Sequence, residues 1–321
     1  MTEIKRAEGK LTPDDMLSAS QVATVMDMNP YQTPNEPLQR AFDATRGIER
    51  VPLDFEALEW GNVFEIPIIE AAVQRLGLKN PKTTFNEAYF HPDIPLACSL
   101  DATVEGDGRT ITVDGDAGIF PMNSDSIVLE GMGVIEAKLT SQEKEMDLPA
   151  YRGKLQLQAQ MMITGAKWGA VCVLYRGITL RIFVYGRDEE IMSQIRGAAV
   201  DFERRVKLYK ENDETDWYEI NKVSDATRIY DSATDDVLED DSLADDVTRI
   251  KELEELMVKM KGEIESCQTR IMSTMRDYKH LVTGPYRVTW GELNYKATPE
   301  KVVPAKPART IRVSKLKIKQ L

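Results

Sequence analysis

Gly133-Val134-Ile135-Glu136-Ala137-Lys138 is a short apolar run that ends in a carboxylate and an ammonium group two residues apart. In a β-strand, residues i and i+2 point to the same face, so Glu136 and Lys138 are expected side by side at the end of a buried strand. Two charges in such a place are costly unless they bind a metal and a phosphate. The segment therefore predicts a site on a buried strand, provided that other parts of the chain complete it.

Length and composition indicate a large chain in a reducing compartment. The 321 residues, 42% of them hydrophobic, are enough for about two domains or one large one. The chain has no apolar run of about 18 residues and no apolar signal core at its start, so we expect no membrane span, no secretion and a cytoplasmic location. Three scattered cysteines form no zinc pattern, and two histidines argue against a His-based catalytic triad or metal site.

The charge is distributed unevenly along the chain. The formal net charge of -12 by itself disfavours nucleic-acid binding, because a phosphate backbone attracts Lys and Arg. However, residues 231–246 contain eight acidic residues and no basic one, and the tail from Lys301 onward contains basic residues and no acidic one. A local basic channel is therefore compatible with the sequence.

Periodicity and turn residues predict an α/β (α+β) fold with a mixed sheet. Ser18 and Ser20 are suitable N-caps for a short helix through Val22 and Val25, and Pro67 is expected to kink or interrupt a later helix. Helices are expected over 35–46, 55–76, 148–164 and 187–212, strands over 89–104, 133–138, 168–175 and 179–185, and a hairpin-like insertion over 104–131.

The C-terminal part is expected to be a long amphipathic helix followed by a small β-region. From Val247 onward, apolar residues recur in alternating steps of three and four. The pattern fits a coiled coil, although packing on the chain's own domain is the interpretation that the length favours. Residues 286–290 and 310–313 are expected to be extended.

The acid-x-Lys pattern needs support from elsewhere, because it occurs four times and, taken alone, an exposed strand end with an incidental ion pair explains it better than a functional site does. Asp101 lies in another apolar strand, and on a strand next to Glu136 it would make a pair of carboxylates suited to Mg²⁺ or Mn²⁺. Glu65 lies beside apolar residues of a helix. Gln156 opens the helix after the Glu136 strand, where it can orient a water or a phosphate oxygen. Gln158 and Gln160 fit a polar helix face.

The order of these motifs resembles the lambda exonuclease family, the YqaJ-like phage recombination exonucleases of the PD-(D/E)xK nuclease superfamily. The resemblance covers roughly residues 16–205 and implies a restriction-endonuclease-like core, in which helices flank a mixed central sheet. The motifs are Ser18-Ala19-Ser20, Gly61 to Glu65, Ser99-Leu100-Asp101, Glu136-Ala137-Lys138, and Tyr151 with Gln156-Leu157-Gln158. Leu100 stands where the family often has Pro, and Leu139-Thr140 stands where it often has Cys-Pro.

The resemblance implies metal-dependent 5′→3′ digestion of one strand of duplex DNA, which leaves 3′ single-stranded tails for recombination by strand annealing. It implies that Asp101 and Glu136 bind Mg²⁺ (Mn²⁺ may substitute) with help from the Ala137 carbonyl, and that Glu65 serves a second ion. Lys138 would position or activate the attacking water, assisted by Gln156. A two-metal clamp of this kind needs no histidine.

The resemblance also implies DNA contacts and partners. The residues expected near the 5′-phosphate are Ser18, Ser20 and Tyr151. The serines precede a short helix, and free N–H groups at a helix start favour an anion. The Arg that precedes the serine motif in lambda exonuclease is absent here, and Lys10 or Arg40 is the expected substitute. The expected partners are double-stranded DNA ends, a single-strand annealing protein, and further copies in a ring-shaped trimer or tetramer. The expected setting is the cytoplasm of a bacterial host, with the gene carried by a phage or mobile element.

These inferences predict a nuclease domain over 1–212 that includes the insertion, an acidic linker over 213–246, and a C-terminal extension over 247–321. Three alternatives remain open from the residues. One is an endonuclease or single-strand nuclease of the same superfamily. Another is a DNA-binding or assembly module without catalysis, which the full set of acidic residues disfavours. The third is a soluble α/β protein in which the motifs are coincidental.

Overall fold

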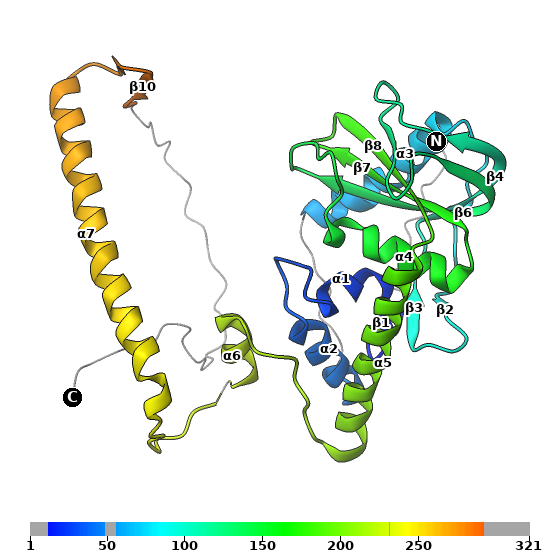
Figure 1. Cartoon of the computed structure of the whole chain (residues 1–321), viewed down its shortest axis with the longest axis horizontal. Coiled ribbons are helices and arrows are strands. Elements are labelled where there is room, and N and C mark those ends of the chain that lie inside the picture. The colour runs from blue at the N-terminus through cyan, green and yellow to red at the C-terminus, as the bar shows by residue number, and fades with distance from the viewer. Residues whose placement is uncertain (1–11, 49–55, 231, 292–321) are drawn as a thin grey trace, which may run out of the picture. The chain divides into compact units, whose positions relative to one another are not determined.

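The computed structural model describes residues 12–48, 56–230 and 232–291 (Figure 1). The chain divides into two compact units, Met1–Asp225 and Ala226–Leu321. Within the described ranges, no helix is both long enough and apolar enough to cross a bilayer. The expected strand at 310–313 lies outside the described residues.

A mixed five-stranded sheet forms the centre of the first unit (Figure 1). In spatial order its strands are β4 (Ala102–Ile111), β6 (Ile127–Thr140), β7 (Trp168–Tyr175), β8 (Thr179–Gly186) and β5 (Ile119–Pro121). β6 pairs antiparallel with β4 and parallel with β7, whereas β8 pairs antiparallel with β7 and parallel with β5. β6, which contains the segment Gly133–Lys138, is therefore paired on both sides. The parallel and antiparallel pairings confirm the expected mixed sheet.

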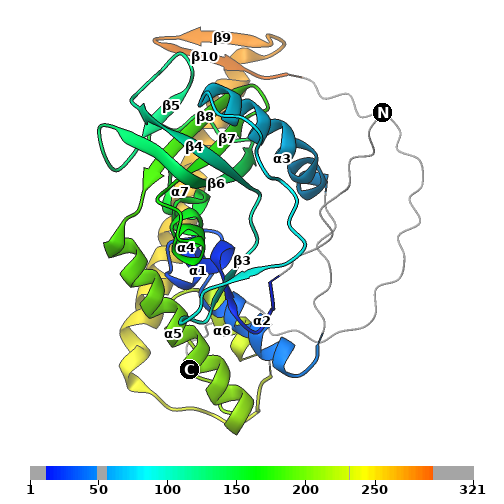
Figure 2. The same cartoon turned by 90° about the vertical axis from the view of Figure 1, so that its right-hand side faces the viewer.

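Helices cover both faces of this sheet (Figure 2). α3 (Glu56–Arg75) packs on one face in a cluster that contains Ile135, whereas α4 (Lys154–Thr164) and α5 (Glu189–Asn212) belong to the cluster on the other face, which contains Val134. Because neighbouring strand residues point to opposite faces, Glu136 and Lys138 are directed toward the α4 side, as Val134 is. The layer that carries the predicted site is thus fixed by the alternation along β6.

A second, small sheet lies beside the start of the chain. β1 (Leu17–Ser18) pairs parallel with β3 (Leu96–Cys98), and β2 (Tyr89–Phe90) pairs antiparallel with β3. The chain then forms the 3₁₀ helix η1 (Ala19–Gln21), the short helix α1 (Val22–Val25) and α2 (Asn35–Thr45). Through β3, this sheet places Ser18 opposite Ala97, four residues before Asp101.

The chain between α5 and residue 225 is fastened to the start of α2. The buried Asp225, in α6 (Val223–Ile229), accepts hydrogen bonds from Thr33 Oγ1 at 2.5 Å and Asn35 Nδ2 at 3.1 Å. Asn35 also exchanges hydrogen bonds with the backbone of Tyr218, at 2.9 and 3.2 Å. These buried polar bonds explain why the first unit extends to Asp225, beyond the end of the expected domain at residue 212.

Three local expectations change in the structure. Residues 104–131, expected as a hairpin-like insertion, form a hairpin whose strands belong to the central sheet. α3 runs unbroken through Pro67, since the apolar stripe that follows the proline packs on the sheet. The expected capping by Ser18 and Ser20 is wrong, because their hydroxyl groups bond each other at 3.1 Å and Gln21 occupies the N-cap of α1.

The second unit contains the long helix α7 (Ala244–Met275) and a hairpin of β9 (His280–Thr283) and β10 (Tyr286–Thr289). The short 3₁₀ helix η3 (Asp241–Leu243) precedes α7, and Arg276 ends the helix with a positive φ of 48°. The expected long helix and small β-region are confirmed.

Gly133 is predicted to be required by its neighbour on β7. A Cβ atom at this position would overlap the ring of the fully buried Trp168, with which Gly133 is paired in register. Gly133→Ala should therefore lower the free energy of unfolding of the first unit by about 1–3 kcal/mol, measured by urea denaturation. Gly197→Ala in α5 is the matched control, because nothing lies within 4 Å of its Cβ position and a helix favours alanine over glycine. Equal effects of the two substitutions would contradict the prediction.

Candidate catalytic centre

Glu136 and Lys138 form an ion pair within the sheet. Lys138 Nζ lies 2.5 Å from Glu136 Oε1, as the strand alternation predicts. Glu136 is 1% exposed, whereas the Lys138 side chain is 32% exposed. Lys138 therefore contacts both the buried Glu136 carboxylate and the solvent.

Two glutamines of α4 complete the surroundings of the Glu136 carboxylate. Gln156 Nε2 donates to Glu136 Oε1 at 2.7 Å, and Gln160 Nε2 donates to Glu136 Oε2 at 2.7 Å. Gln156 Oε1 also accepts from Lys138 Nζ at 3.1 Å. Residues four apart share one helix face, so a single helix supplies both amides. The buried negative charge is compensated by one cation and two amide donors, which is what burial of a carboxylate requires.

Gln160 has a role at the site that the sequence pattern did not indicate, and Gln158 is buried where an exposed position was expected. Both side chains are fully buried, so the interpretation as a polar helix face is wrong. Gln160 binds Glu136 and the Ser99 carbonyl, whereas Gln158 donates to Gly186 O at 2.9 Å and accepts from the Asp188 amide at 3.0 Å. The spacing of four from Gln156 was the available signal for Gln160. The roles of these glutamines depend on partners distant in sequence, which spacing alone does not give.

Asp101 immediately precedes β4, the strand that pairs with β6, and lies close to the Glu136 motif. Its Oδ2 accepts the Ala137 backbone N–H at 2.9 Å, which fastens the half-buried carboxylate to the motif itself. Burial, and next the negative charge of Glu136, raise the pKa of Asp101 well above its usual value. The expected proximity of Asp101 and Glu136 is therefore present in the structure.

Glu65 joins the site from α3. It lies one turn before Ile68 and Ile69, on the stripe that faces the sheet, and is half-buried. Burial, followed by the charge of Glu136, raises the pKa of Glu65. Burial acts to lower the pKa of Lys138, but Glu136 and Asp101 outweigh it and leave the pKa raised. Lys138 is therefore a stable ammonium group among three carboxyl groups.

The donor set fits a hard divalent cation. In the described ranges, no three His, Cys, Asp or Glu side chains converge closely enough to hold an ion. Hydrogen bonds from Gln156 and Gln160 reach both oxygens of Glu136. Even so, the charge of Glu136 disfavours ionisation of both Asp101 and Glu65. Lys138 offsets this effect at both carboxyl groups, and the Ala137 backbone N–H adds to it at Asp101. A divalent ion bound by carboxylate oxygens would relieve this repulsion, so the residues present suit Mg²⁺ or Mn²⁺.

The predicted phosphate-binding serines lie on β1 and η1, and Arg40 lies on α2. Ser18 is buried and Ser20 is exposed, and their hydroxyl groups bond each other. Arg40 is half-buried. The helix that follows the serines has only four residues, so its dipole offers little to an anion. Any phosphate binding by this segment would depend on the exposed Ser20 hydroxyl group and nearby cations.

Tyr151 lies near the motif, on the 3₁₀ helix η2 (Ala150–Arg152) that leads into α4. Its ring meets the exposed Tyr31 edge to face, with centroids 5.6 Å apart, and the Arg152 guanidinium lies 5.4 Å from its centroid. Arg152 also donates to Thr140 Oγ1 at 3.0 Å. Thr140 follows Lys138 by two residues on the same strand face, which places this aromatic pair beside the site.

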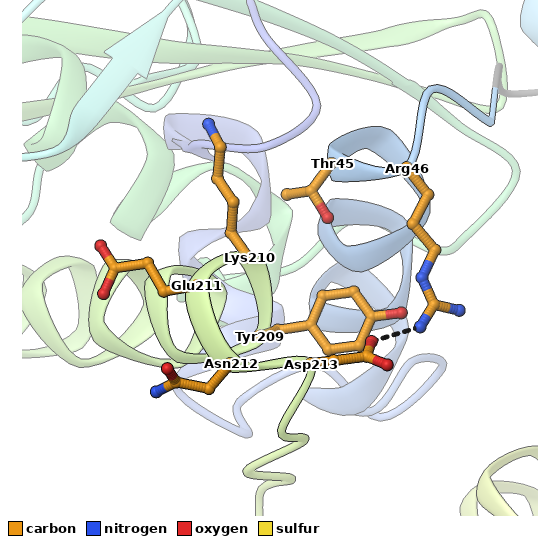
Figure 3. A pocket seen from close by; sticks show the side chains of 7 residues that line it. All are labelled: Thr45, Arg46, Tyr209, Lys210, Glu211, Asn212 and Asp213. Carbon is orange, nitrogen blue, oxygen red and sulfur yellow. Dashed lines mark hydrogen bonds and ion pairs between the residues drawn. The ribbon is translucent and has the colours of Figure 1, made fainter.

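The described part of the first unit also contains a hollow of about 380 Å³ away from these residues (Figure 3). The ends of α2 and α5 line it, with Thr45, Arg46, Tyr209, Lys210, Glu211, Asn212 and Asp213. Arg46 pairs with Asp213 at 2.7 Å and covers the Tyr209 ring. None of the residues predicted for the site lines this hollow, so it is not part of the candidate centre.

The fold and the site define an α/β protein with an acidic, lysine-containing centre on β6, an inner strand of its sheet. The chain belongs to the YqaJ-like viral recombinase family, because the YqaJ-like viral recombinase domain matches residues 6–167, half of the chain. This membership confirms the resemblance found in the sequence motifs. Comparison with curated proteins finds no match.

Comparison with solved structures finds matches of low similarity. An alkaline exonuclease, LHK-Exo, from Laribacter hongkongensis is 19% identical, with a TM-score of 0.44 over 62% of this chain and 91% of the other. The same enzyme in complex with dAMP gives 17% identity and a TM-score of 0.42, over 61% and 90% of the two chains. A phage-related exonuclease from Haemophilus somnus gives 12% identity and a TM-score of 0.36, over 61% and 96%.

Metal binding at this centre is predicted to strengthen as the pH rises. Because its pKa is raised, Asp101 keeps its proton to a higher pH than an ordinary carboxyl group, and a cation must displace this proton in order to bind. Above that pKa, protons no longer compete with the cation for the carboxylate. Below that pKa, the apparent affinity for Mn²⁺ should rise by up to about tenfold per pH unit, measured by calorimetric titration.

Asp101→Asn should abolish most of this binding and its pH dependence. Asp107→Asn is the control, because Asp107 is an exposed carboxylate whose pKa is lowered to about 2 by its hydrogen bonds to Arg109. Binding of Mn²⁺ that is equally strong in Asp101→Asn and the unchanged protein would refute the assignment.

Proposed function

We propose that this protein is a metal-dependent exonuclease that digests one strand of linear duplex DNA from 5′ to 3′ and leaves 3′ single-stranded tails for strand annealing. The observation that carries the proposal is the buried Glu136 carboxylate, held by Lys138, Gln156 and Gln160 beside Asp101. Membership of the YqaJ-like viral recombinase family supports a role in recombination.

In this proposal Asp101, Glu136, Glu65 and the Ala137 carbonyl hold two Mg²⁺ ions, for which Mn²⁺ substitutes. Such ions supply an activated water and stabilise the leaving oxygen of the phosphodiester. Glu136 and Ala137 lie on β6, Asp101 immediately precedes β4, and Glu65 lies on α3. The set spans two strands and a helix, so the intact first unit is required for the site.

Lys138 acts as a fixed positive charge. Its pKa is raised, so it retains its proton at neutral pH and is better suited to orienting a water and stabilising a phosphate than to removing a proton. Gln156 accepts one of its hydrogen bonds and thereby holds the ammonium group in place. Glu136 thus has two tasks, since it anchors Lys138 and contributes a metal ligand.

DNA reaches this centre past the aromatic pair and the serine segment. Tyr151 and the exposed Tyr31 offer ring faces and edges on which a base can stack, and Arg152 adds a positive charge beside them. Ser18, Ser20 and Arg40 are proposed to contact the 5′-phosphate. The further proposed partners are a single-strand annealing protein and additional copies of the chain in a ring, a trimer or tetramer, in the host cytoplasm.

Digestion of linear duplex DNA tests the activity. Lys138→Ala and Glu136→Ala should each lower the rate by about 100-fold or more, because each removes a group that acts on the reacting phosphate. Lys167→Ala is the control, since Lys167 forms an exposed ion pair with Glu130 on the same sheet. Undiminished digestion by either site variant would refute the assignment.

The DNA substrate distinguishes the proposed exonuclease from its alternatives. Linear duplexes labelled at either end, with and without a 5′-phosphate, report polarity and end preference. An exonuclease leaves closed circular duplex DNA intact, whereas an endonuclease of the same superfamily cuts it. Absence of both digestion and Mn²⁺ binding would favour an assembly module.

Tyr151→Ala should weaken the binding of DNA by an amount typical of one stacked base, about 1–3 kcal/mol, and raise KM more than it lowers kcat. Tyr151→Phe should retain most of the affinity, because the ring remains. Steady-state kinetics on a labelled linear duplex give both constants. A loss in Tyr151→Phe as large as in Tyr151→Ala would assign the effect to the hydroxyl group and its contact with Arg152.

A further inference from the structure

α7 carries a regular apolar seam that the described residues of its own unit leave exposed. From Ile250 onward, eight positions alternate in steps of three and four, as in the a and d positions of a heptad repeat. Seven of the eight are Ile, Leu, Met or Cys, and their exposed fractions lie between 36% and 56% where values are given. The positions are Ile250, Leu253, Met257, Met260, Ile264, Cys267, Ile271 and Thr274. Side chains of this kind are normally covered by another helix.

We propose that this seam binds the same seam of a second copy of the chain, as a parallel, in-register, two-stranded coiled coil. α7 has 32 residues, which gives about 48 Å of helix and accommodates the full seam. The proposal concerns the second unit and does not depend on nuclease activity in the first.

The side chains in the seam favour two parallel strands. Position a is β-branched in three of four heptads, at Ile250, Ile264 and Ile271. Position d holds Leu253, Met260 and Cys267, which are unbranched at Cβ, and one β-branched residue, Thr274. β-branched residues at a with leucine at d favour parallel dimers over trimers and tetramers. The residue types therefore indicate the number of strands as well as the seam.

The charges beside the seam favour the parallel orientation. In a parallel pair, Arg249 at position g lies near Glu254 at position e of the other helix, and the attraction occurs twice by symmetry. An antiparallel pair with the same layers would place Arg249 near Arg270 of the other copy. Within one chain Arg249 pairs with Glu252 at 3.0 Å, at exposed positions where exchange of partners costs little. The charges thus disfavour the antiparallel arrangement.

The parallel register brings two Cys267 side chains opposite each other at position d. Cys267 is exposed, whereas the other two cysteines, Cys98 and Cys172, are buried. It is therefore a native reporter of both orientation and register. The same register places the two β9–β10 hairpins at one end of the coiled coil.

Light scattering on the full chain tests the association. Ile264→Glu places a charge in the seam and should lower the molar mass by a factor of two. Val258→Glu, on the outer face of the same helix and 72% exposed, should leave it unchanged. Equal masses for the unchanged protein and Ile264→Glu would overturn the proposal and indicate that another part of the chain covers the seam.

Mild oxidation with glutathione disulfide tests the register. Two Cys267 thiols would lose two protons and two electrons to the oxidant, which gives one interchain disulfide and two molecules of reduced glutathione. A crosslinked dimer should form in the unchanged protein and disappear on reduction. Cys267→Ser should not crosslink, nor should the double variant Cys267→Ser, Thr269→Cys, whose thiol lies on the outer face. Association without a Cys267 crosslink would overturn the parallel register, as would equal crosslinking at position 269.

Discussion

The burial of the Glu136 carboxylate is the constraint on which the arrangement of the first unit depends. An uncompensated charge at this depth would cost several kcal/mol, so every neighbour that donates to it must be held in place. Lys138 comes from the same strand, and Gln156 and Gln160 come from the helix packed above it. The position of α4 over β6 is therefore both a packing requirement and an electrostatic one.

This constraint links the two layers that cover the sheet. The helix α4 supplies hydrogen-bond donors to Glu136. On the other face, α3 carries Glu65, a carboxyl group whose pKa is raised by burial and by the negative charge of Glu136. Asp101 accepts a hydrogen bond from the Ala137 backbone N–H, which ties its carboxylate to β6. A centre held by buried hydrogen bonds suits the proposed hydrolysis, which depends on the positioning of a phosphodiester.

The two units differ in how their apolar residues are used. In the first, the apolar residues on both faces of β6 are buried under helices, and the sheet has a complete core. In the second, the apolar residues of α7 form a narrow stripe, and those of the seam are exposed. A stripe of this width is too small to form a core alone and is suited to a partner helix.

The sequence alone determined the elements and the acidic set, because both have local signals. Strand alternation placed Glu136 beside Lys138, the heptad-like spacing gave α7, and the ordered motifs gave the family. Only the tertiary structure decided the rest. Gln160 donates a hydrogen bond to Glu136, residues 104–131 contribute strands to the central sheet, and residues 213–225 belong to the first unit. Each of these outcomes depends on partners 20 or more positions away in sequence. Spacing along the chain carries information about faces of one element, whereas the choice of partner element is made by packing and by the need to satisfy buried charge.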